Sequence, residues 1–123
     1  MSKRNIVHIE IPAADSAAAG KFYADLFGWK IEHIPEMNYT MWEPESAPGG
    51  GFTPLEGSTS PGDVLIYVDS DDIEADLQRV TELGGTIIQS KMEIPNTGWF
   101  GIFKDPTGNT IALYTSMNPE FNQ

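Results

Sequence analysis

The chain has 123 residues, no cysteine, a hydrophobic content of 40% and a formal net charge of −11. This composition suits one soluble domain with a packed core, and its acidity opposes binding to phosphate backbones, since the seven lysine and arginine residues are scattered. The absence of cysteine excludes disulfides, thiolate metal sites and cysteine nucleophiles. No segment is apolar enough for a signal peptide or a membrane span. We therefore expect a cytoplasmic protein that binds neither nucleic acid nor membrane.

The first half predicts one strand, one helix and three further strands. Apolar and polar residues alternate over 6–11, which is the period of a strand. Asp15 or Ser16 is a suitable N-cap for the helix that follows, and Gly28 is a suitable C-cap. The apolar stripe of this helix consists of Ala18, Ala19, Phe22 and Leu26. Glycines 49 to 51 are interpreted as a flexible corner before the last strand. The three strands are expected at 29–34, 39–44 and 51–56.

The second half repeats this order after a linker rich in glycine, serine and proline. A strand at 63–69 precedes a helix at 71–85 that Asp71 or Asp72 would cap. The apolar face of this helix consists of Ile73, Leu77, Val80 and Leu83. The last three strands are expected at 86–94, 98–105 and 109–115. The segment 105–109, DPTGN, predicts the tight turn between the last two of them.

A shift of 56 residues superimposes the two halves, placing Asp15 on Asp71 and Gly28 on Gly84. The chain therefore predicts an α+β fold of two βαβββ modules in a single domain. Two sheets of this kind, each with one face covered by its helix, can pair to enclose a ligand cavity. The expected bounds are module one at 1–57, a linker at 58–62, module two at 63–117 and a C-terminal tail at 118–123.

Three segments carry a family resemblance. They are FYADLFGWKIE at 22–32, SDDIEADLQRVTELGGTII at 70–88 and GWFGIFKDPTGNTIALY at 98–114. In these segments the chain resembles the vicinal oxygen chelate superfamily, which includes glyoxalase I, extradiol dioxygenases and bleomycin-resistance proteins. The resemblance implies two βαβββ modules that form a curved mixed sheet around a concave cavity, commonly assembled as a homodimer.

The resemblance also implies where a divalent metal would bind, on the first, fourth, fifth and eighth strands. By alignment these positions hold His8, Pro54, Val64 or Leu65, and Ala112. Such a site needs at least three histidine or carboxylate ligands and an open position for substrate. Even if a shift in register brings Glu56 to the fourth-strand position, two ligands are too few. We therefore expect no cofactor, with a divalent metal on His8 and Glu56 or Glu10 as the alternative.

Strand parity places His8 and Glu10 on one face. This pair suggests a catalytic general base held by a carboxylate, although Glu10 at a solvated rim, or a His8 that only donates a hydrogen bond to a ligand carbonyl, are simpler interpretations. His33 is expected at an exposed rim. The candidate ligand-binding residues are His8, Tyr39, Trp42, Tyr67, Trp99, Phe103 and Tyr114. The alternative for each aromatic residue is a place in the core or in a dimer interface.

The sequence thus predicts a glyoxalase-like protein that binds a small organic molecule, forms a homodimer and lacks the usual metal site. One alternative is a metal-dependent glyoxalase-like lyase, isomerase or dioxygenase with an atypical site on His8. The other alternative is a drug-sequestering resistance protein, with which the net charge of −11 is compatible.

Overall fold

The structure, a computed structural model, describes residues 2–57 and 59–117. The chain forms two compact units. One, which we call module one, comprises His8–Leu65, and the other, module two, joins the residues up to Val7 to the chain from Ile66 onward. Each module contains a helix and a mixed sheet, which confirms the predicted α+β class and the repeated βαβββ order. The expected tail at 118–123 and residue 58 of the expected linker lie outside the described residues.

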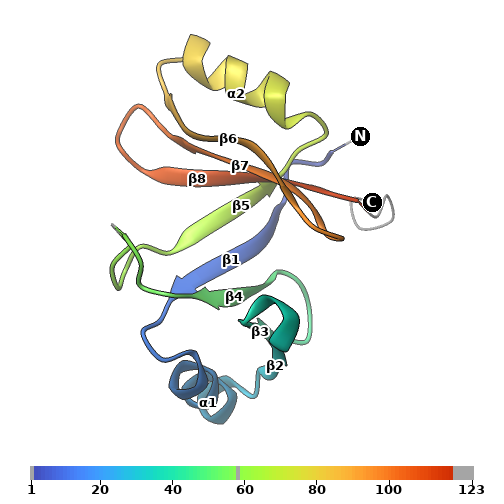
Figure 1. The fold of residues 1–123 in the computed structure, drawn as a ribbon, viewed down its shortest axis with the longest axis vertical. Coiled ribbons are helices and arrows are strands. Elements are labelled where there is room, and N and C mark those ends of the chain that lie inside the picture. Colours follow the sequence, from blue (N-terminus) through green and yellow to red (C-terminus); the bar gives the residue numbers. More distant parts are fainter. Residues whose placement is uncertain (1, 58, 118–123) are drawn as a thin grey trace. The chain divides into compact units, whose positions relative to one another are not determined.

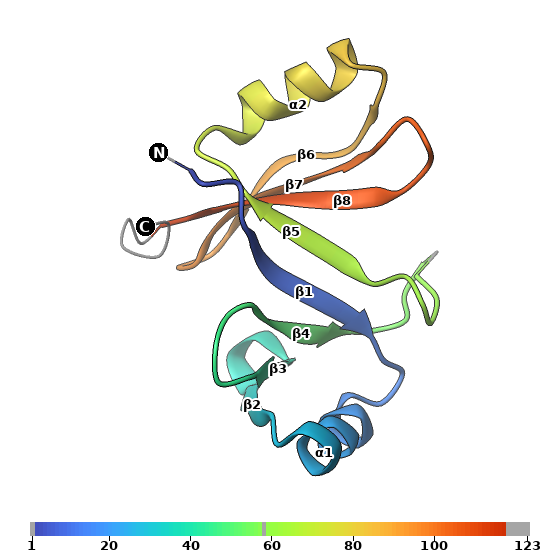
Figure 2. The same cartoon turned by 180° about the vertical axis from the view of Figure 1, so that it is seen from behind.

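The sheet of module one has the strand order β2-β3-β4-β1. Its strands are β1 (Ile6–Pro12), β2 (Lys30–Ile34), β3 (Tyr39–Glu43) and β4 (Gly49–Thr53). β1 pairs with β4 in parallel, whereas the β2–β3 and β3–β4 pairs are antiparallel. A short 3₁₀ turn, η1 (Pro35–Met37), connects β2 to β3. The helix α1 (Ser16–Phe27) lies beside this sheet in Figure 1 and, from behind, in Figure 2.

Helix α1 begins and ends where the sequence predicts, but it packs on a different face. The Asp15 carboxylate accepts a hydrogen bond from the Ala18 N–H, and Gly28 ends the helix in the left-handed conformation, with φ of 77°. The predicted stripe is wrong, because Phe22 and Leu26 are 58% and 59% exposed. The packed face instead contains Gly20, which is buried against Ile31 of β2, and Tyr23, which stacks on Phe52 of β4 with ring centroids 6.0 Å apart.

The glycines at 49 to 51 begin β4 rather than forming a flexible corner, and the strand ends at Thr53 instead of extending to residue 56. Two of these glycines make room for aromatic rings of β3. A Cβ at Gly50 would lie 2.4 Å from Cζ2 of Trp42, and a Cβ at Gly51 would lie 1.9 Å from Oη of Tyr39. The glycines therefore serve close packing between neighbouring strands, not chain flexibility.

The sheet of module two has the strand order β5-β8-β7-β6. Its strands are β5 (Leu65–Asp69), β6 (Thr86–Ile94), β7 (Gly98–Lys104) and β8 (Thr110–Ser116). β5 pairs with β8 in parallel, and β8, β7 and β6 pair antiparallel. The helix α2 (Ile73–Glu82) lies along this sheet (Figure 1) and buries Ile73 and Leu77 against Leu113 of β8. The predicted cap is confirmed, since the Asp72 carboxylate accepts from the Ala75 N–H at 3.1 Å.

The N-terminal segment belongs to module two, which the sequence does not indicate. Both Asp76 carboxylate oxygens accept from the guanidinium of Arg4, one of them at 3.0 Å, and the Ser70 hydroxyl donates to Asp76 at 2.6 Å. Burial alone would raise the pKa of Asp76, but the hydrogen bonds from Arg4 and Ser70 and the charge of Arg4 together lower it. These contacts tie the segment before β1 to the start of α2.

The DPTGN segment forms the predicted turn between β7 and β8. Asp105 accepts hydrogen bonds from the Thr107 N–H at 2.9 Å and from the Asn109 N–H at 3.0 Å. These backbone bonds, with the Thr107 hydroxyl, lower the pKa of Asp105. Asp105 and Asn109 are thus turn residues, as expected.

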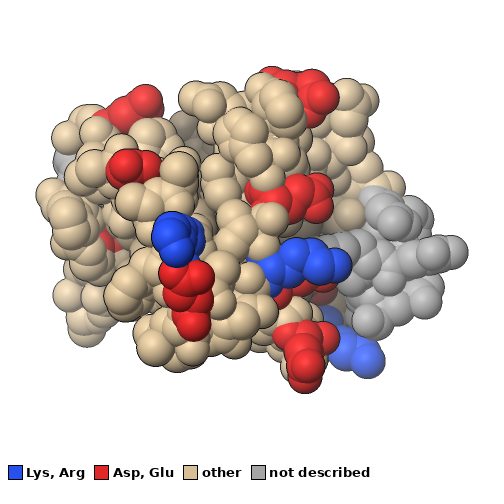
Figure 3. Space-filling view, turned by 90° about the horizontal axis from the view of Figure 1, so that it is seen from below, with Lys and Arg blue, Asp and Glu red and all other residues tan. Residues whose placement is uncertain are grey.

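Acidic side chains are dispersed over the face drawn in Figure 3, and the few basic ones on that face lie among them. Among the described residues, neither helix has the length and apolarity needed to cross a bilayer.

Candidate functional site

Three polar side chains meet on the face of module one that is turned away from α1, which we call its far face. Ile31, which contacts Gly20 of α1, is aligned across the sheet with Trp42, Gly50 and Ile9, so these positions face the helix. The alternate residues His8 and Glu10 of β1 therefore occupy the far face.

Tyr39 of β3 joins His8 and Glu10 on the far face. Its hydroxyl lies 2.8 Å from Nε2 of His8 and donates to Oε2 of Glu10 at 2.8 Å. Nε2 of His8 and Oε2 of Glu10 are 3.8 Å apart, and the two side chains are 25% and 14% exposed. The predicted pairing of His8 and Glu10 is thus present, but the phenol of Tyr39 bridges it. We call these three residues the His8–Tyr39–Glu10 cluster.

Two predicted ligand residues of module two lie on the face turned away from α2. Tyr67 is aligned with Ala112, and Tyr114 lies two residues further along β8. Burial raises the pKa of the Tyr114 phenol, and a hydrogen bond with Ser116 offsets this only in part. The Tyr114 hydroxyl also donates to the Thr97 carbonyl at 3.3 Å.

The other two predicted ligand residues of module two, Trp99 and Phe103, lie on the helix side. Both pack against the core of Ile73, Leu77 and Leu113. Their strand parity was predicted correctly, but a Cβ at Gly101, between them, would lie 3.0 Å from Ile73 and 3.1 Å from Leu77, which shows that this parity faces α2. They contribute to the core of module two.

Trp42 lies in the core of module one. It is 4% exposed and stacks on Trp29 with ring centroids 4.3 Å apart, and its Nε1–H donates to the Gly51 carbonyl at 3.1 Å. Trp29 in turn stacks on Tyr23 of α1, so the ring of Trp42 lies on the face of the sheet that packs against α1. His33 is exposed, as expected, and its Nδ1 lies 3.1 Å from the Thr40 hydroxyl.

The donor groups do not fit the divalent-metal site that the fold implies. His8 is aligned with Gly49 of β4, and this strand offers only glycine, phenylalanine and threonine side chains. Pro54 and Glu56 lie beyond the end of β4, and Ala112 of β8 has no donor atom. Within 2–57 and 59–117, no three histidine, aspartate or glutamate side chains are grouped so that they could hold a metal ion. Nε2 of His8 is instead bonded to Tyr39.

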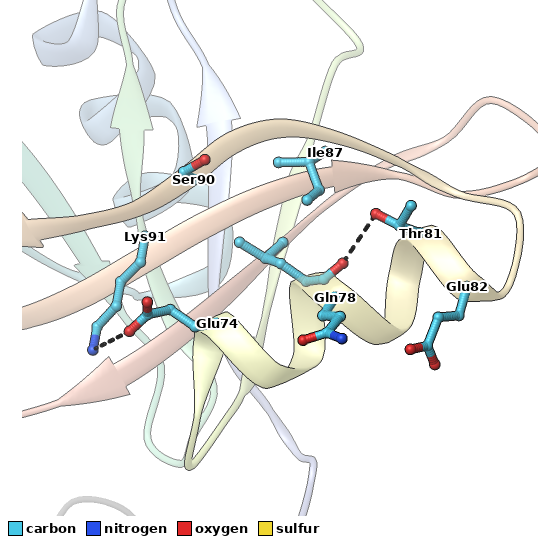
Figure 4. A pocket seen from close by; sticks show the side chains of 8 residues that line it. Glu74, Gln78, Thr81, Glu82, Ile87, Ser90 and Lys91 are labelled. Carbon is cyan, nitrogen blue, oxygen red and sulfur yellow. Dashed lines mark hydrogen bonds and ion pairs between the residues drawn. The ribbon is translucent and has the colours of Figure 1, made fainter.

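A separate groove lies between α2 and β6, outside the predicted site (Figure 4). Its volume is about 580 Å³. The groove is lined by Glu74, Leu77, Gln78, Thr81, Glu82, Ile87, Ser90 and Lys91. Lys91 already has two partners, since its Nζ lies 3.7 Å from the Glu74 carboxylate and 5.2 Å from the ring centroid of Trp99. None of the candidate ligand-binding or catalytic residues predicted from the sequence lines this groove.

Comparisons with known proteins agree with this architecture. The profile of the Glyoxalase/Bleomycin resistance protein/Dioxygenase superfamily matches residues 5–113. A glyoxylase-like domain-containing protein from Didymella fabae is 35% identical over 119 residues, which cover 87% of this chain and 90% of that protein. The chain therefore belongs to the glyoxalase/bleomycin resistance protein/dioxygenase superfamily.

More distant relatives include larger proteins and solved structures. Anthracycline biosynthesis protein DnrV from Streptomyces peucetius is 25% identical, and the match covers 85% of this chain but 44% of that protein, so the chain spans less than half its length. The structure of hypothetical protein BH1468 from Bacillus halodurans C-125 has a TM-score of 0.71 at 15% identity, covering 94% of this chain and 96% of that one. Methylmalonyl-CoA epimerase from Mycobacterium tuberculosis has a TM-score of 0.67 at 16% identity, covering 95% and 90%. The likenesses to these two solved structures show the fold alone.

Proposed function

We propose that this chain binds a small organic molecule on the far face of module one, at the His8–Tyr39–Glu10 cluster, without the divalent-metal site implied by the fold. The support is chemical. The cluster concentrates an imidazole, a phenol and a carboxylate, all partly exposed, on one sheet face. Sites with a few convergent polar groups on a rigid scaffold are typical of ligand binding. The names of relatives, such as the methylmalonyl-CoA epimerase and the anthracycline biosynthesis protein, also refer to small organic molecules.

The observation that carries the metal-free part of the proposal is the environment of His8. The neighbouring strand β4 has glycines opposite His8 and Glu10. Nε2 of His8 is hydrogen-bonded to the phenol of Tyr39. Neutral phenols and glycines are not ligands that Zn²⁺, Ni²⁺, Mn²⁺ or Fe²⁺ prefers. A metal would have to displace Tyr39 and then share only His8 and Glu10.

Metal analysis tests this directly. The purified chain would be incubated with Zn²⁺, Ni²⁺, Mn²⁺ or Fe²⁺, desalted, and its metal content measured by mass spectrometry, with His8→Ala as the matched control. We expect the same low, substoichiometric content for both proteins. One metal per chain that disappears in His8→Ala would overturn the proposal and favour a metal-dependent glyoxalase-like lyase, isomerase or dioxygenase.

Ligand binding requires its own test. Screening of a small-molecule library by chemical-shift perturbation on labelled protein would look for compounds that shift the signals of His8, Glu10 and Tyr39. We expect binders whose shifts are lost in His8→Ala. Binders that perturb only residues remote from the cluster would contradict the site.

The net charge of −11 favours one particular alternative, sequestration of a cationic drug. Calorimetric titration with bleomycin, a cationic glycopeptide, would show binding at micromolar concentrations if this were the activity. No heat of binding at those concentrations would remove this candidate without affecting the wider proposal.

We also propose that the chain is cytoplasmic and that it forms a homodimer. The reason for the dimer is that sheet edges such as β2 and β6 are aggregation-prone unless they are covered. Light scattering coupled to size exclusion, at tens of micromolar protein, would give twice the mass of 13.5 kDa. A mass equal to a single chain would contradict the dimer.

A further inference from the structure

The His8–Tyr39–Glu10 cluster determines which nitrogen of His8 carries the proton. A phenol has one proton to donate and a carboxylate only accepts, so the Tyr39 hydroxyl uses its proton on Glu10, at 2.8 Å. Nε2 of His8 lies 2.8 Å from the same hydroxyl, whose remaining role is to accept. Nε2 must therefore be the donor. Neutral His8 is then the Nε2–H tautomer, and its lone pair is on Nδ1.

Gly51 explains why the phenol can occupy this place. A Cβ at residue 51 would lie 1.9 Å from Oη and 2.1 Å from Cζ of Tyr39, distances that real side chains essentially never show. The ring of Tyr39 thus lies directly over the Gly51 backbone. Gly49, the other glycine of β4 on this face, is different, because the nearest atom to its Cβ would be the Trp42 carbonyl oxygen, at 3.1 Å, and no aromatic ring is among its close neighbours. Of these two glycines, only Gly51 leaves the space that the ring of Tyr39 occupies.

We propose that Tyr39 is a positioning residue and that Gly51 leaves the space its ring occupies. Together they hold His8 in the Nε2–H tautomer, because the Glu10 carboxylate accepts the hydrogen bond of the Tyr39 hydroxyl. The importance of this arrangement for ligands rests on the proposed function. In this tautomer the only N–H of neutral His8 is used by Tyr39, so the imidazole has none to donate to a ligand carbonyl. A ligand group that contacts Nδ1 of neutral His8 is therefore a hydrogen-bond donor, such as a hydroxyl, an amide N–H or an ammonium group. This replaces the expectation that His8 donates to a carbonyl.

The tautomer can be read by NMR without any ligand. Long-range ¹H–¹⁵N correlation spectra distinguish a protonated ring nitrogen from one that carries a lone pair. The chain has only two histidines. A His33→Gln variant therefore assigns the signals, and His33 serves as an internal control in the other spectra. The spectra would be recorded at a pH where both imidazoles are neutral.

For the wild-type chain we expect the protonated signal at Nε2 of His8 and the lone-pair signal at Nδ1. In Tyr39→Phe the hydroxyl is removed, and the separation between the two nitrogen shifts should collapse toward the average of exchanging tautomers. Gly51→Ala should have the same effect, because its methyl group displaces the ring. Gly49→Ala, the matched control, should retain the wild-type pattern. The His33 signals should be unchanged in all three variants.

Two results would overturn the inference. One is a wild-type His8 protonated at Nδ1, and the other is a tautomer that persists in both Tyr39→Phe and Gly51→Ala. Amide fingerprint spectra show whether each variant is folded, and Tyr39→Phe decides the matter if Gly51→Ala does not fold. Because no ligand is present, failure to find a small-molecule binder would contradict the proposed function while leaving the tautomer result intact.

Discussion

The indole of Trp42 stacks on the indole of Trp29, with ring centroids 4.3 Å apart and planes inclined by 15°. Tyr23 continues the stack from Trp29 to Phe52. Stacked and offset aromatic pairs stabilise a core beyond the area they bury. This stack, rather than the predicted apolar stripe, attaches α1 to the sheet of module one, and it places Trp42 away from the proposed site.

Replacing Trp42 by phenylalanine should destabilise the fold without affecting the far face. The variant loses part of the stack and leaves the Gly51 carbonyl without its 3.1 Å partner. We expect the free energy of unfolding to fall by about 2 kcal/mol. Urea unfolding followed by circular dichroism would measure it. Trp99→Phe, in a half-buried position, serves as the control and should cost less. Loss of ligand binding at unchanged stability would instead mean that Trp42 contacts the ligand.

Gly50→Ala should be the most damaging glycine substitution in β4. Its methyl group would lie 1.8 Å from the Ile9 carbonyl oxygen, which is backbone and cannot rotate away. We expect a loss of about 3 kcal/mol in the free energy of unfolding. Gly49→Ala, with its nearest contact at 3.1 Å, should cost clearly less. Equal midpoints of thermal unfolding for the two variants would show that β4 is not packed as described.

Substitutions on α1 should distinguish its packed face from the predicted stripe. Phe22 is 58% exposed, so Phe22→Ser should change the free energy of unfolding by about 0.5 kcal/mol. Tyr23→Ala removes the ring that contacts both Trp29 and Phe52, and should cost about 3 kcal/mol. Denaturant unfolding of the two variants provides the comparison. If Phe22→Ser proves the more damaging, the sequence-predicted stripe is the packed face after all.

The Arg4–Asp76 ion pair should make stability depend on pH in a definite direction. Because the pKa of Asp76 is lowered in the folded state, its contribution is complete above the ordinary value of 3.8 and is lost as the pH falls through the folded value. Arg4→Met should lower the free energy of unfolding at pH 7 by about 1 kcal/mol. The difference from wild type should shrink at acid pH, where Asp76 is protonated in both proteins. A difference that stays constant down to pH 2 would refute the ion pair as its cause.

Much of the fold can be predicted from the sequence because the signals are local. Alternation at 6–11, the caps at Asp15, Gly28 and Asp72, and the side chain of Asp105 in its turn all act within a few residues of the chain. The family also follows from local motifs, and the profile match over residues 5–113 confirms it.

The choice of faces and the site geometry required the tertiary structure. Parity groups Trp99 with Phe103, but only their packing against Ile73 and Leu77 of α2 shows that this group faces the core. The same holds for α1, where aromatic stacking on Trp29 favours the face of Tyr23 over a stripe that is apolar in sequence.

By itself, then, the sequence determined the α+β class, the two βαβββ modules, the family and the pairing of His8 with Glu10 on one strand face. Only the tertiary structure placed Tyr39, 29 residues beyond Glu10, between these two side chains. The physical reason is that a bridging hydrogen bond depends on the pairing of β1 with β4 and of β4 with β3, and on a glycine at residue 51 that leaves room for the ring. No pattern within one strand encodes that relationship.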